Sequence, residues 1–227
     1  MISKFIFNNQ YLLNELPKTD KELLEKVMQH KKYRKNQAVF TEGTLPTGIF
    51  YVKEGKVKKY KVDNDGREQI IYIYNAGEFF GYSAILSEEP YGDTTVTIED
   101  AIISFISKDD FTDLLDTSVI FNRLLLKSLS HEFSVMVNLM AVLSQRTVRE
   151  RVALSLLILH NKYKICDTEK IVFIMLSRAD LANMAGTANE TLARVLHDFK
   201  DDNLIWMEGR KIQLLNLQRL TQIANFS

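Results

Sequence analysis

Two side chains of opposite charge, Glu190 and Arg194, stand four residues apart in a segment with helical periodicity. Residues four apart on a helix are neighbours one turn from each other, so these two side chains share one face. The spacing is compatible with an exposed ion pair worth about 0.3–0.5 kcal/mol. It is equally compatible with readout of duplex DNA, in which Arg forks to guanine O6 and N7 while Glu accepts from the cytosine amino group. Spacing alone leaves both interpretations open.

The elements around this pair have the pattern of a winged helix-turn-helix. We expect a helix over 177–184, a tight turn over 185–187 and a second helix over 188–200, with Gly186 supplying the sharp reversal. Residues 203–207 and 211–214 predict a β-hairpin of the size of a wing around 208–210. The two helices carry their own apolar core, made of Leu181, Met184, Leu192, Val195, Leu196 and Phe199.

Glycine and proline positions separate the rest of the chain into two parts. Seven of the nine glycines and all three prolines lie before residue 93. Gly55, Gly66 and Gly77 are eleven residues apart, which is typical of the turn spacing in an all-β sandwich or barrel. We therefore expect strands over 49–55, 56–62, 68–74, 94–100 and 101–107, preceded by a short helix over 20–30. Between Gly92 and Gly186 the chain has no glycine or proline, as long helices require.

One stretch in this span has the heptad spacing of a coiled coil. Its apolar positions follow alternating steps of three and four residues, at Leu126, Leu129, Phe133, Met136, Met140 and Leu143. The repeat lasts about two and a half heptads, which is short of the ~3–4 heptads of a secure assignment. A helix that pairs with a second copy of the chain is favoured, and packing of the stripe on its own domain is the alternative.

Composition excludes several classes of protein. The chain has 29 Lys+Arg and 29 Asp+Glu, but residues 1–145 hold 17 against 20 and residues 146–227 hold 12 against 9, so the C-terminal third is the better candidate for contact with nucleic acid. The single cysteine, Cys166, excludes a disulfide framework, a four-thiolate zinc site and a cysteine-ligated iron–sulfur cluster. No apolar run is long enough for a signal peptide or a membrane span, so we expect a cytoplasmic protein without membrane contact.

The segment 186–196, GTANETLARVL, resembles the recognition helix of Crp/Fnr transcription regulators, whose pattern is roughly G-x-S/T-x-E-T-V/I-x-R-x-L. The similarity extends over nearly the whole chain. It implies that Glu190 and Arg194 read a G·C pair in a TGA-like half-site. Asn189 stands where cyclic-AMP-binding members often carry a further guanine-reading Arg. The phosphate-contacting positions implied by the resemblance are Ser177, Arg178, Thr187, Arg210 and Lys211.

The resemblance also implies a sensor pocket in the N-terminal roll. The family's roll often holds a cyclic nucleotide, with its ribose on the Glu of a Gly-Glu pair, which Gly77 and Glu78 match. A buried phosphate needs a fixed cation, yet residues 68–107 contain seven acids and no Lys or Arg. The long-helix positions that carry base-contacting hydroxyls in cyclic-AMP binders are Met136 and Val137 here. We therefore predict that cyclic AMP is not the effector.

An uncharged or hydrophobic effector, or none, fits the residues that remain. No His occurs between His30 and His131, so we expect neither haem nor a metal in the roll, and no cofactor. The residues assigned to an effector pocket are Tyr72, Glu78, Phe79, Phe80, Tyr82, Met136 and Val137. Tyr74 and Tyr91 are further aromatic candidates for this pocket, and core packing is the alternative role for most of the aromatic residues.

These observations predict an α+β chain with an N-terminal double-stranded β-helix (jelly roll) over 1–116, a dimerisation helix over 117–146 and a winged helix-turn-helix over 147–227. The expected function is that of a homodimeric transcription regulator that binds pseudo-palindromic double-stranded DNA, contacts RNA polymerase and responds to an unknown small molecule. A small-molecule-sensing module whose winged helix contacts proteins is the alternative. An enzyme is the weakest interpretation, because no nucleophile motif or phosphate-cradling glycine loop is present.

Overall fold

The computed structural model describes residues 2–164 and 171–225, so Cys166 lies outside the described residues. The described chain divides into two compact units. We call Phe7–Lys61 together with Ile71–Phe133 the sheet unit, and the remaining described residues the C-terminal unit. No described helix combines the length and apolarity needed to cross a lipid bilayer.

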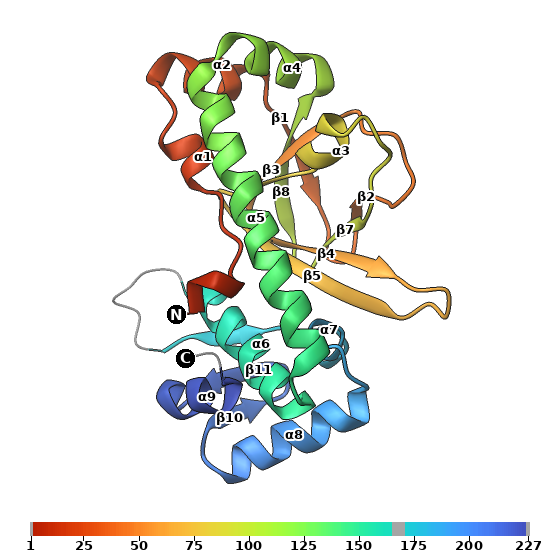
Figure 1. The fold of residues 1–227 in the computed structure, drawn as a ribbon, viewed down its shortest axis with the longest axis vertical. Helices are drawn as coiled ribbons and strands as arrows, with labels where there is room; N and C mark the ends of the chain where they lie inside the picture. Colours follow the sequence, from red (N-terminus) through yellow and green to blue (C-terminus); the bar gives the residue numbers. More distant parts are fainter. Residues whose placement is uncertain (1, 165–170, 226–227) are drawn as a thin grey trace. The chain divides into compact units, whose positions relative to one another are not determined.

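Eight strands of the described chain form the N-terminal jelly roll (Figure 1). They lie in two four-stranded sheets with the orders β1-β8-β3-β6 and β2-β7-β4-β5. The bounds are β1 Gln29–Tyr33, β2 Ala38–Phe40, β3 Gly48–Glu54, β4 Lys56–Val62, β5 Glu68–Asn75, β6 Phe79–Phe80, β7 Thr94–Thr97 and β8 Ala101–Ser107. The glycine-spaced runs expected to be strands correspond to β3, β4 and β5, and the predicted roll is confirmed.

The helix expected over residues 20–30 lies two to three residues earlier in the chain than predicted. It begins at Lys18 and ends at Val27 (α2, Lys18–Val27), and His30 lies instead in β1. There the His30 Nδ1 is 2.8 Å from the hydroxyl of Ser104 on the neighbouring strand β8. Strand pairing between positions 74 residues apart therefore outweighs the local helical pattern.

Short helices close the roll and contribute to its core. They are α1 Tyr11–Asn14, α3 Tyr82–Leu86 and α4 Lys108–Thr117, whereas the 3₁₀ helix η1 (Ile2–Phe5) belongs to the C-terminal unit. Helix α4 starts at Ser107, whose side chain accepts a hydrogen bond from the backbone N–H of Asp110 as an N-cap. The rings of Phe111 and Phe121 meet edge-on, 6.0 Å apart, and both are fully buried. This contact packs α4 against the start of the long helix.

The long helix α5 (Val119–Gln145) carries the predicted heptad stripe. Most of that stripe is uncovered in the single chain: Phe133 is 71% exposed and Met140 is 65% exposed. Leu126, Met136 and Leu143 are also exposed, whereas Leu129 packs partly on the core of the sheet unit. We call the exposed positions Leu126, Phe133, Met136, Met140 and Leu143 the seam of α5, and the described residues leave it largely uncovered.

The described residues after α5 form the winged helix-turn-helix that the sequence predicted. Its helices are α6 Val148–Tyr163, α7 Arg178–Ala185, α8 Asn189–Asp201 and α9 Leu217–Ala224. A three-stranded antiparallel sheet has the order β10-β11-β9, with β9 Phe173–Met175, β10 Ile205–Glu208 and β11 Lys211–Leu214. Helix α6 begins with a complete capping box, in which Thr147 and Glu150 each accept from the other's backbone N–H.

Candidate nucleic-acid interface and the cavity of the roll

The turn between α7 and α8 is held by backbone conformation and by one arginine. Gly186 ends α7 in the left-handed region, at φ 61°, which a residue with a Cβ rarely adopts. Arg151 on α6 donates to the carbonyl oxygens of Ala185 and Gly186 at 2.8 and 2.9 Å, and to that of Arg146 at 3.0 Å. The guanidinium thus satisfies carbonyls at the end of α7 and just after α5, which ties the turn to the start of α6.

The face of α8 that carries Glu190 and Arg194 is open to solvent. Leu192, Val195, Leu196 and Phe199 on the opposite face are buried, as predicted for the core. Within the described residues, neither Glu190 nor Arg194 has an ion pair or side-chain hydrogen bond, so the surface pair that the spacing also allowed is not formed. Asn189 at the start of the helix is exposed too. The N-terminal half of α8 therefore presents unengaged polar side chains.

The opposite end of α8 is acidic and already paired. Arg149 of α6 contacts Asp198 at 3.5 Å and Asp202 at 2.9 Å, and His197 lies 2.9 Å from Asp201. A polyanion is repelled by these carboxylates, whereas the N-terminal turn offers free backbone N–H groups and the positive end of the helix dipole. The charge distribution along α8 therefore favours contact with DNA through its first two turns.

Two residues expected to contact phosphate have partners within the chain. The Ser177 hydroxyl donates to the Asp180 carboxylate at 2.6 Å and accepts from the Asp180 backbone N–H, so it caps α7. Arg178 donates from Nη2 to the carbonyl oxygen of Gly209 in the wing turn at 3.0 Å, and partial burial lowers the pKa of its guanidinium. Its buried Nη1 has no partner among the described residues.

The other three phosphate candidates lie on the turn and the wing. Thr187 is half-buried and its backbone N–H donates to the carbonyl of Ala182. Arg210 and Lys211 are exposed, and the Lys211 ammonium lies over the ring of Phe173, 5.8 Å from its centroid. Arg210 has no side-chain partner in the described part of the chain.

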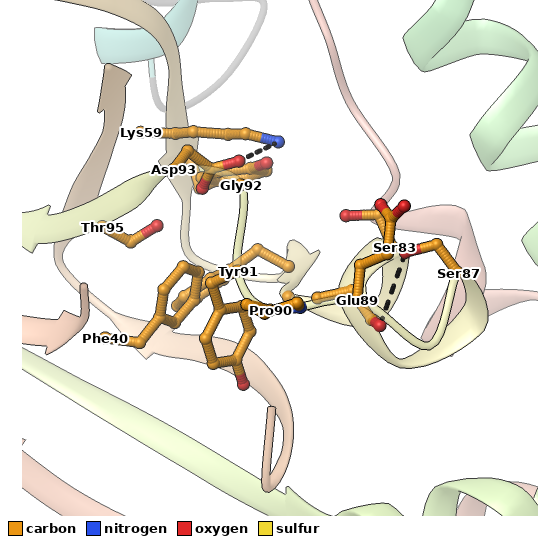
Figure 2. Close-up of a pocket in the computed structure, with 14 residues that line it drawn as sticks. Phe40, Lys59, Ser83, Ser87, Glu89, Pro90, Tyr91, Gly92, Asp93 and Thr95 are labelled. Carbon is orange, nitrogen blue, oxygen red and sulfur yellow. Dashed lines mark hydrogen bonds and ion pairs between the residues drawn. The ribbon is translucent and has the colours of Figure 1, made fainter. Parts of the chain in front are cut away.

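A cavity of about 220 Å³ opens in the sheet unit (Figure 2). Its floor is buried and its rim is exposed. The rings of Phe40 and Tyr91 stack at 3.8 Å on one side. The lining consists of Phe40, Lys59, Tyr74, Phe80, Gly81, Ser83, Ala84, Ser87, Glu89, Pro90, Tyr91, Gly92, Asp93 and Thr95.

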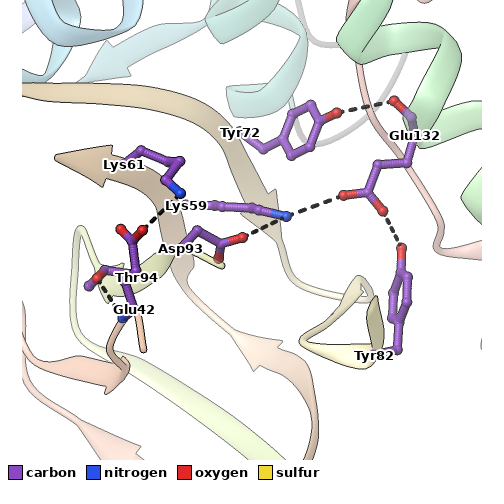
Figure 3. A network of polar contacts seen from close by, with 8 residues as sticks. All are labelled: Glu42, Lys59, Lys61, Tyr72, Tyr82, Asp93, Thr94 and Glu132. Atoms are coloured by element: carbon purple, nitrogen blue, oxygen red, sulfur yellow. Dashed lines mark hydrogen bonds and ion pairs between the residues drawn. The ribbon is translucent and has the colours of Figure 1, made fainter. Parts of the chain in front are cut away.

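The stretch 68–107 supplies no cation, but Lys59 from β4 brings one into the cavity lining. Its ammonium lies 3.1 Å from the Asp93 carboxylate and 3.4 Å from that of Glu132 on α5 (Figure 3). Burial is the largest effect on Lys59 and lowers its pKa, but Glu132 and Asp93 together raise that pKa above its usual value. Burial is also the largest effect on Asp93, and it raises the pKa of this carboxyl although the ammonium of Lys59 lowers it. Lys59 belongs to β4, outside the acidic stretch 68–107, so sequence order did not show that its side chain reaches the cavity.

Of the residues assigned to an effector pocket, only Phe80 lines this cavity. The hydroxyls of Tyr72 and Tyr82 donate to the backbone oxygen and the carboxylate of Glu132, at 3.2 and 2.9 Å. Glu78 is buried and its carboxylate accepts from the backbone N–H of Asn75.

The other three assigned residues also lie away from the cavity lining. Phe79 packs in the core with its ring 4.8 Å from that of Tyr51. Met136 and Val137 are exposed on α5, in the C-terminal unit. Tyr74 and Tyr91, which the sequence also offered as aromatic pocket candidates, do line the cavity and are buried.

No group of three or more His, Cys, Asp or Glu in the described ranges is arranged to hold a metal ion. The arrangement of the described residues therefore offers an exposed helix for recognition of DNA and a small, charged cavity in the roll.

Comparison with known proteins identifies both parts of the chain. Residues 30–118 match the model of the cyclic nucleotide-binding domain, and residues 150–223 match that of the Crp-like helix-turn-helix domain. The fumarate and nitrate reduction regulatory protein of Yersinia pestis is 25% identical over 88% of this chain and 81% of its own length. The cyclic AMP receptor protein of Thermus thermophilus is 24% identical over 94% and 96%.

The solved structures show the same architecture. The structure of FixK2 from Bradyrhizobium japonicum superposes with a TM-score of 0.78 and 25% identity, covering 88% of this chain and 99% of that one. The two matched domains follow one another in the order in which the roll and the winged helix-turn-helix occur here. The chain belongs to the Crp/Fnr family of transcription regulators.

Proposed function

We propose that this regulator binds a pseudo-palindromic DNA site as a homodimer and reads each half-site with Glu190 and Arg194. The observation that carries the proposal is the exposed, unengaged state of both side chains on the first two turns of α8. Arg donates a bidentate pair to guanine, and Glu accepts from cytosine, so one G·C pair suffices for both. Asn189 completes the base-reading set.

The phosphate contacts fall to residues that flank this helix. Arg210 and Lys211 on the wing carry the exposed charges, and Thr187 offers its hydroxyl beside the turn. Ser177 contributes by capping the start of α7, whose backbone N–H groups face the phosphate. Arg178 contributes by holding the wing turn through its hydrogen bond to the Gly209 carbonyl. Phosphate contacts fix the register of a protein on DNA, whereas base contacts specify the sequence.

The exposed seam on α5 supports the homodimer. A second copy paired along Phe133, Met136 and Met140 covers apolar surface that the single chain leaves in water. Two recognition helices must match half-sites one DNA turn apart, about 34 Å, so small movements of paired helices change affinity. A dimer bound to both half-sites acts on transcription by contacting RNA polymerase.

The cavity of the roll supports an effector other than cyclic AMP. A cyclic nucleotide carries a phosphate anion, which needs a cation with unused donors. The ammonium of Lys59 is shared between Asp93 and Glu132, and Glu89 adds a further carboxylate at the rim. Insertion of a phosphate beside these acids costs several kcal/mol.

Selection of bound sites from random duplex DNA, followed by binding measurements with variants, tests the DNA-reading role. We expect Arg194→Ala to weaken binding to the selected site by about 1–3 kcal/mol, or roughly 5- to 150-fold in Kd, and to relax preference at one G·C pair. Lys200→Ala is the matched control, because Lys200 is an exposed cation near the acidic end of the same helix. Arg210→Ala should weaken binding to all sequences and lower the salt slope by about one.

Three results would each contradict a part of the proposal. If Arg194→Ala loses affinity for selected and random DNA equally, Arg194 does not read a base. Absence of salt-dependent DNA binding by the unmodified protein favours a winged helix that contacts proteins. A saturable thermal shift with micromolar cyclic AMP would refute the proposal that the effector is a compound other than cyclic AMP.

A further inference from the structure

The cavity of the roll contains a polar atom that the fold does not use. Thr95 on β7 lines the cavity and is only 1% exposed (Figure 2). Its hydroxyl has no hydrogen-bond partner among the described residues. Burial of an unsatisfied hydroxyl is unfavourable, because the group gives up its hydrogen bonds to water and gains none in return. Its neighbour Thr94, by contrast, accepts a hydrogen bond from the backbone N–H of Glu42. The orphaned hydroxyl of Thr95 therefore marks a place where a ligand can supply the missing partner.

The charges around this hydroxyl are acidic in sum. Asp93 and Glu89 line the cavity, and Glu132 reaches the same ammonium as Asp93. Lys59 is the one cation in the lining given by the described residues, and it already faces two carboxylates. The local balance is three carboxylates to one ammonium, so the cavity attracts positive charge and repels negative charge.

The cavity also has an aromatic wall. The rings of Phe40 and Tyr91 stack with an interplanar angle of 12°, and the Tyr91 hydroxyl is fixed by donation to the Gly48 backbone oxygen at 2.9 Å. Aromatic faces attract ammonium groups and stack on flat apolar groups. A volume of about 220 Å³ lies below the ~300–1,000 Å³ of sites for drug-sized ligands. The ligand must therefore be small.

We propose that this cavity binds a small organic ammonium compound, which donates hydrogen bonds to Asp93 and Thr95 and packs its apolar part against Phe40 and Tyr91. The proposal deepens the proposed function, on which it rests for the role of the compound as effector. The acidic lining, the unsatisfied hydroxyl and the aromatic wall are three separate features, and an ammonium compound with a short apolar body matches all of them.

The probe is 2-phenylethylamine, with 2-phenylethanol and phenylacetate as neutral and anionic compounds of similar size. Isothermal titration to the full-length protein should give saturable binding of the amine, at least tenfold weaker binding of the alcohol and none of the acid. Equal binding of all three compounds, tighter binding of phenylacetate, or no binding of the amine overturns the proposal.

Two variants locate the site. Thr95→Val removes the hydroxyl but keeps the shape, so we expect it to hold or raise the Tm while it weakens amine binding at least fivefold. We expect Asp93→Asn to weaken amine binding more than Thr95→Val does. Glu42→Gln is the control, because Glu42 is an acid of the same roll that pairs with Lys61 outside the cavity lining. Unchanged amine binding by Thr95→Val overturns the assignment of this cavity.

The selected DNA separates this inference from the proposed function. Amine binding that leaves DNA affinity unchanged supports the chemistry of the cavity and refutes the effector role. Amine binding by a protein that binds no DNA supports the cavity and refutes the proposed function. DNA binding by a protein that binds no amine refutes the inference alone.

Discussion

Lys59 offers the sharpest test of how the roll is held together. Its side chain is only 12% exposed, and its two carboxylate partners, Asp93 and Glu132, are 16% and 10% exposed. Removal of one member of a buried charge group leaves the others unpaired in a medium of low dielectric constant, at a cost of about 3–5 kcal/mol. We expect Lys59→Met to lower the free energy of unfolding of the sheet unit by this amount at pH 7.

Lys61→Met is a matched control on the same strand. Lys61 pairs with Glu42 at 2.8 Å, but the two side chains are 51% and 40% exposed. Exposed pairs contribute about 0–1 kcal/mol, because water and salt screen them. The same substitution two residues along β4 should therefore cost several-fold less, although its ion pair is shorter.

A neutral triple variant separates charge from packing. Lys59→Met combined with Asp93→Asn and Glu132→Gln removes all three charges, and the amide oxygen of the new side chain at 132 still accepts from the Tyr82 hydroxyl. Replacement of a complete buried charge group is often nearly neutral. We expect the triple variant to recover more than half of the stability lost by Lys59→Met.

The pH dependence gives an independent check. Burial raises the pKa of Asp93, and removal of the ammonium removes a contribution that lowers it. Asp93 in the Lys59→Met variant therefore takes up a proton at a higher pH than in the unmodified protein. The stability deficit of Lys59→Met should be largest at neutral pH and should shrink as the pH falls.

Urea-induced unfolding followed by far-UV circular dichroism measures these differences, with hydrogen exchange of the β4 and β7 amides to report on the sheet unit. Fluorescence of Trp206, the single tryptophan, reports on the C-terminal unit. Equal losses below 1 kcal/mol for Lys59→Met and Lys61→Met would refute the reasoning. A triple variant less stable than Lys59→Met would show that the charges themselves stabilise the roll.

Three further predictions concern the C-terminal unit and α5. Arg151→Met should lower the free energy of unfolding of the C-terminal unit by about 1.5–3 kcal/mol, because hydrogen bonds from a charged donor to Ala185 and Gly186 are lost. Urea unfolding followed by Trp206 fluorescence measures this loss. A change below about 0.5 kcal/mol would show that Arg151 does not stabilise the turn between α7 and α8. Hydrogen bonds from Asn225 first, and then from Thr147, lower the pKa of Glu150 to about 2 from 4.5. Its ionised form therefore stabilises the fold above pH 4.5, and this contribution is lost as the pH falls toward 2, so Glu150→Gln should lower the Tm at pH 7 and make little difference near pH 2. Met140→Lys should shift the protein from dimer to monomer in sedimentation equilibrium, whereas Ala141→Lys, an exposed position beside the seam, should not; two dimeric variants would refute pairing through the seam.

Much of the recognition element could be predicted from local pattern. The core of α8 follows from apolar spacing, and the turn before it follows from a glycine that tolerates positive φ. The strands between Gly48 and Val62 follow in the same way from turn residues and short β-rich runs. These features depend on residues within one or two turns of each other, so sequence order contains the information.

Helix α3 and strand β6 could not be predicted, because each is too short to show a period. Strand β6 has two residues, and α3 begins after Gly81. Both are stabilised by tertiary contacts: β6 pairs with β3, and Tyr82 at the start of α3 reaches Glu132 on α5. Such elements form only when distant parts of the chain come together.

The sequence by itself determined the order of roll, long helix and winged helix-turn-helix, and it placed Glu190 and Arg194 on one helical face, because helical and strand periods are written in neighbouring residues. Only the tertiary structure decided which groups meet in the roll. Lys59 and Glu132 are 73 residues apart, and no local spacing encodes their contact. Likewise, only folding left the hydroxyl of Thr95 buried without a partner, since satisfaction of a polar group depends on every element packed around it.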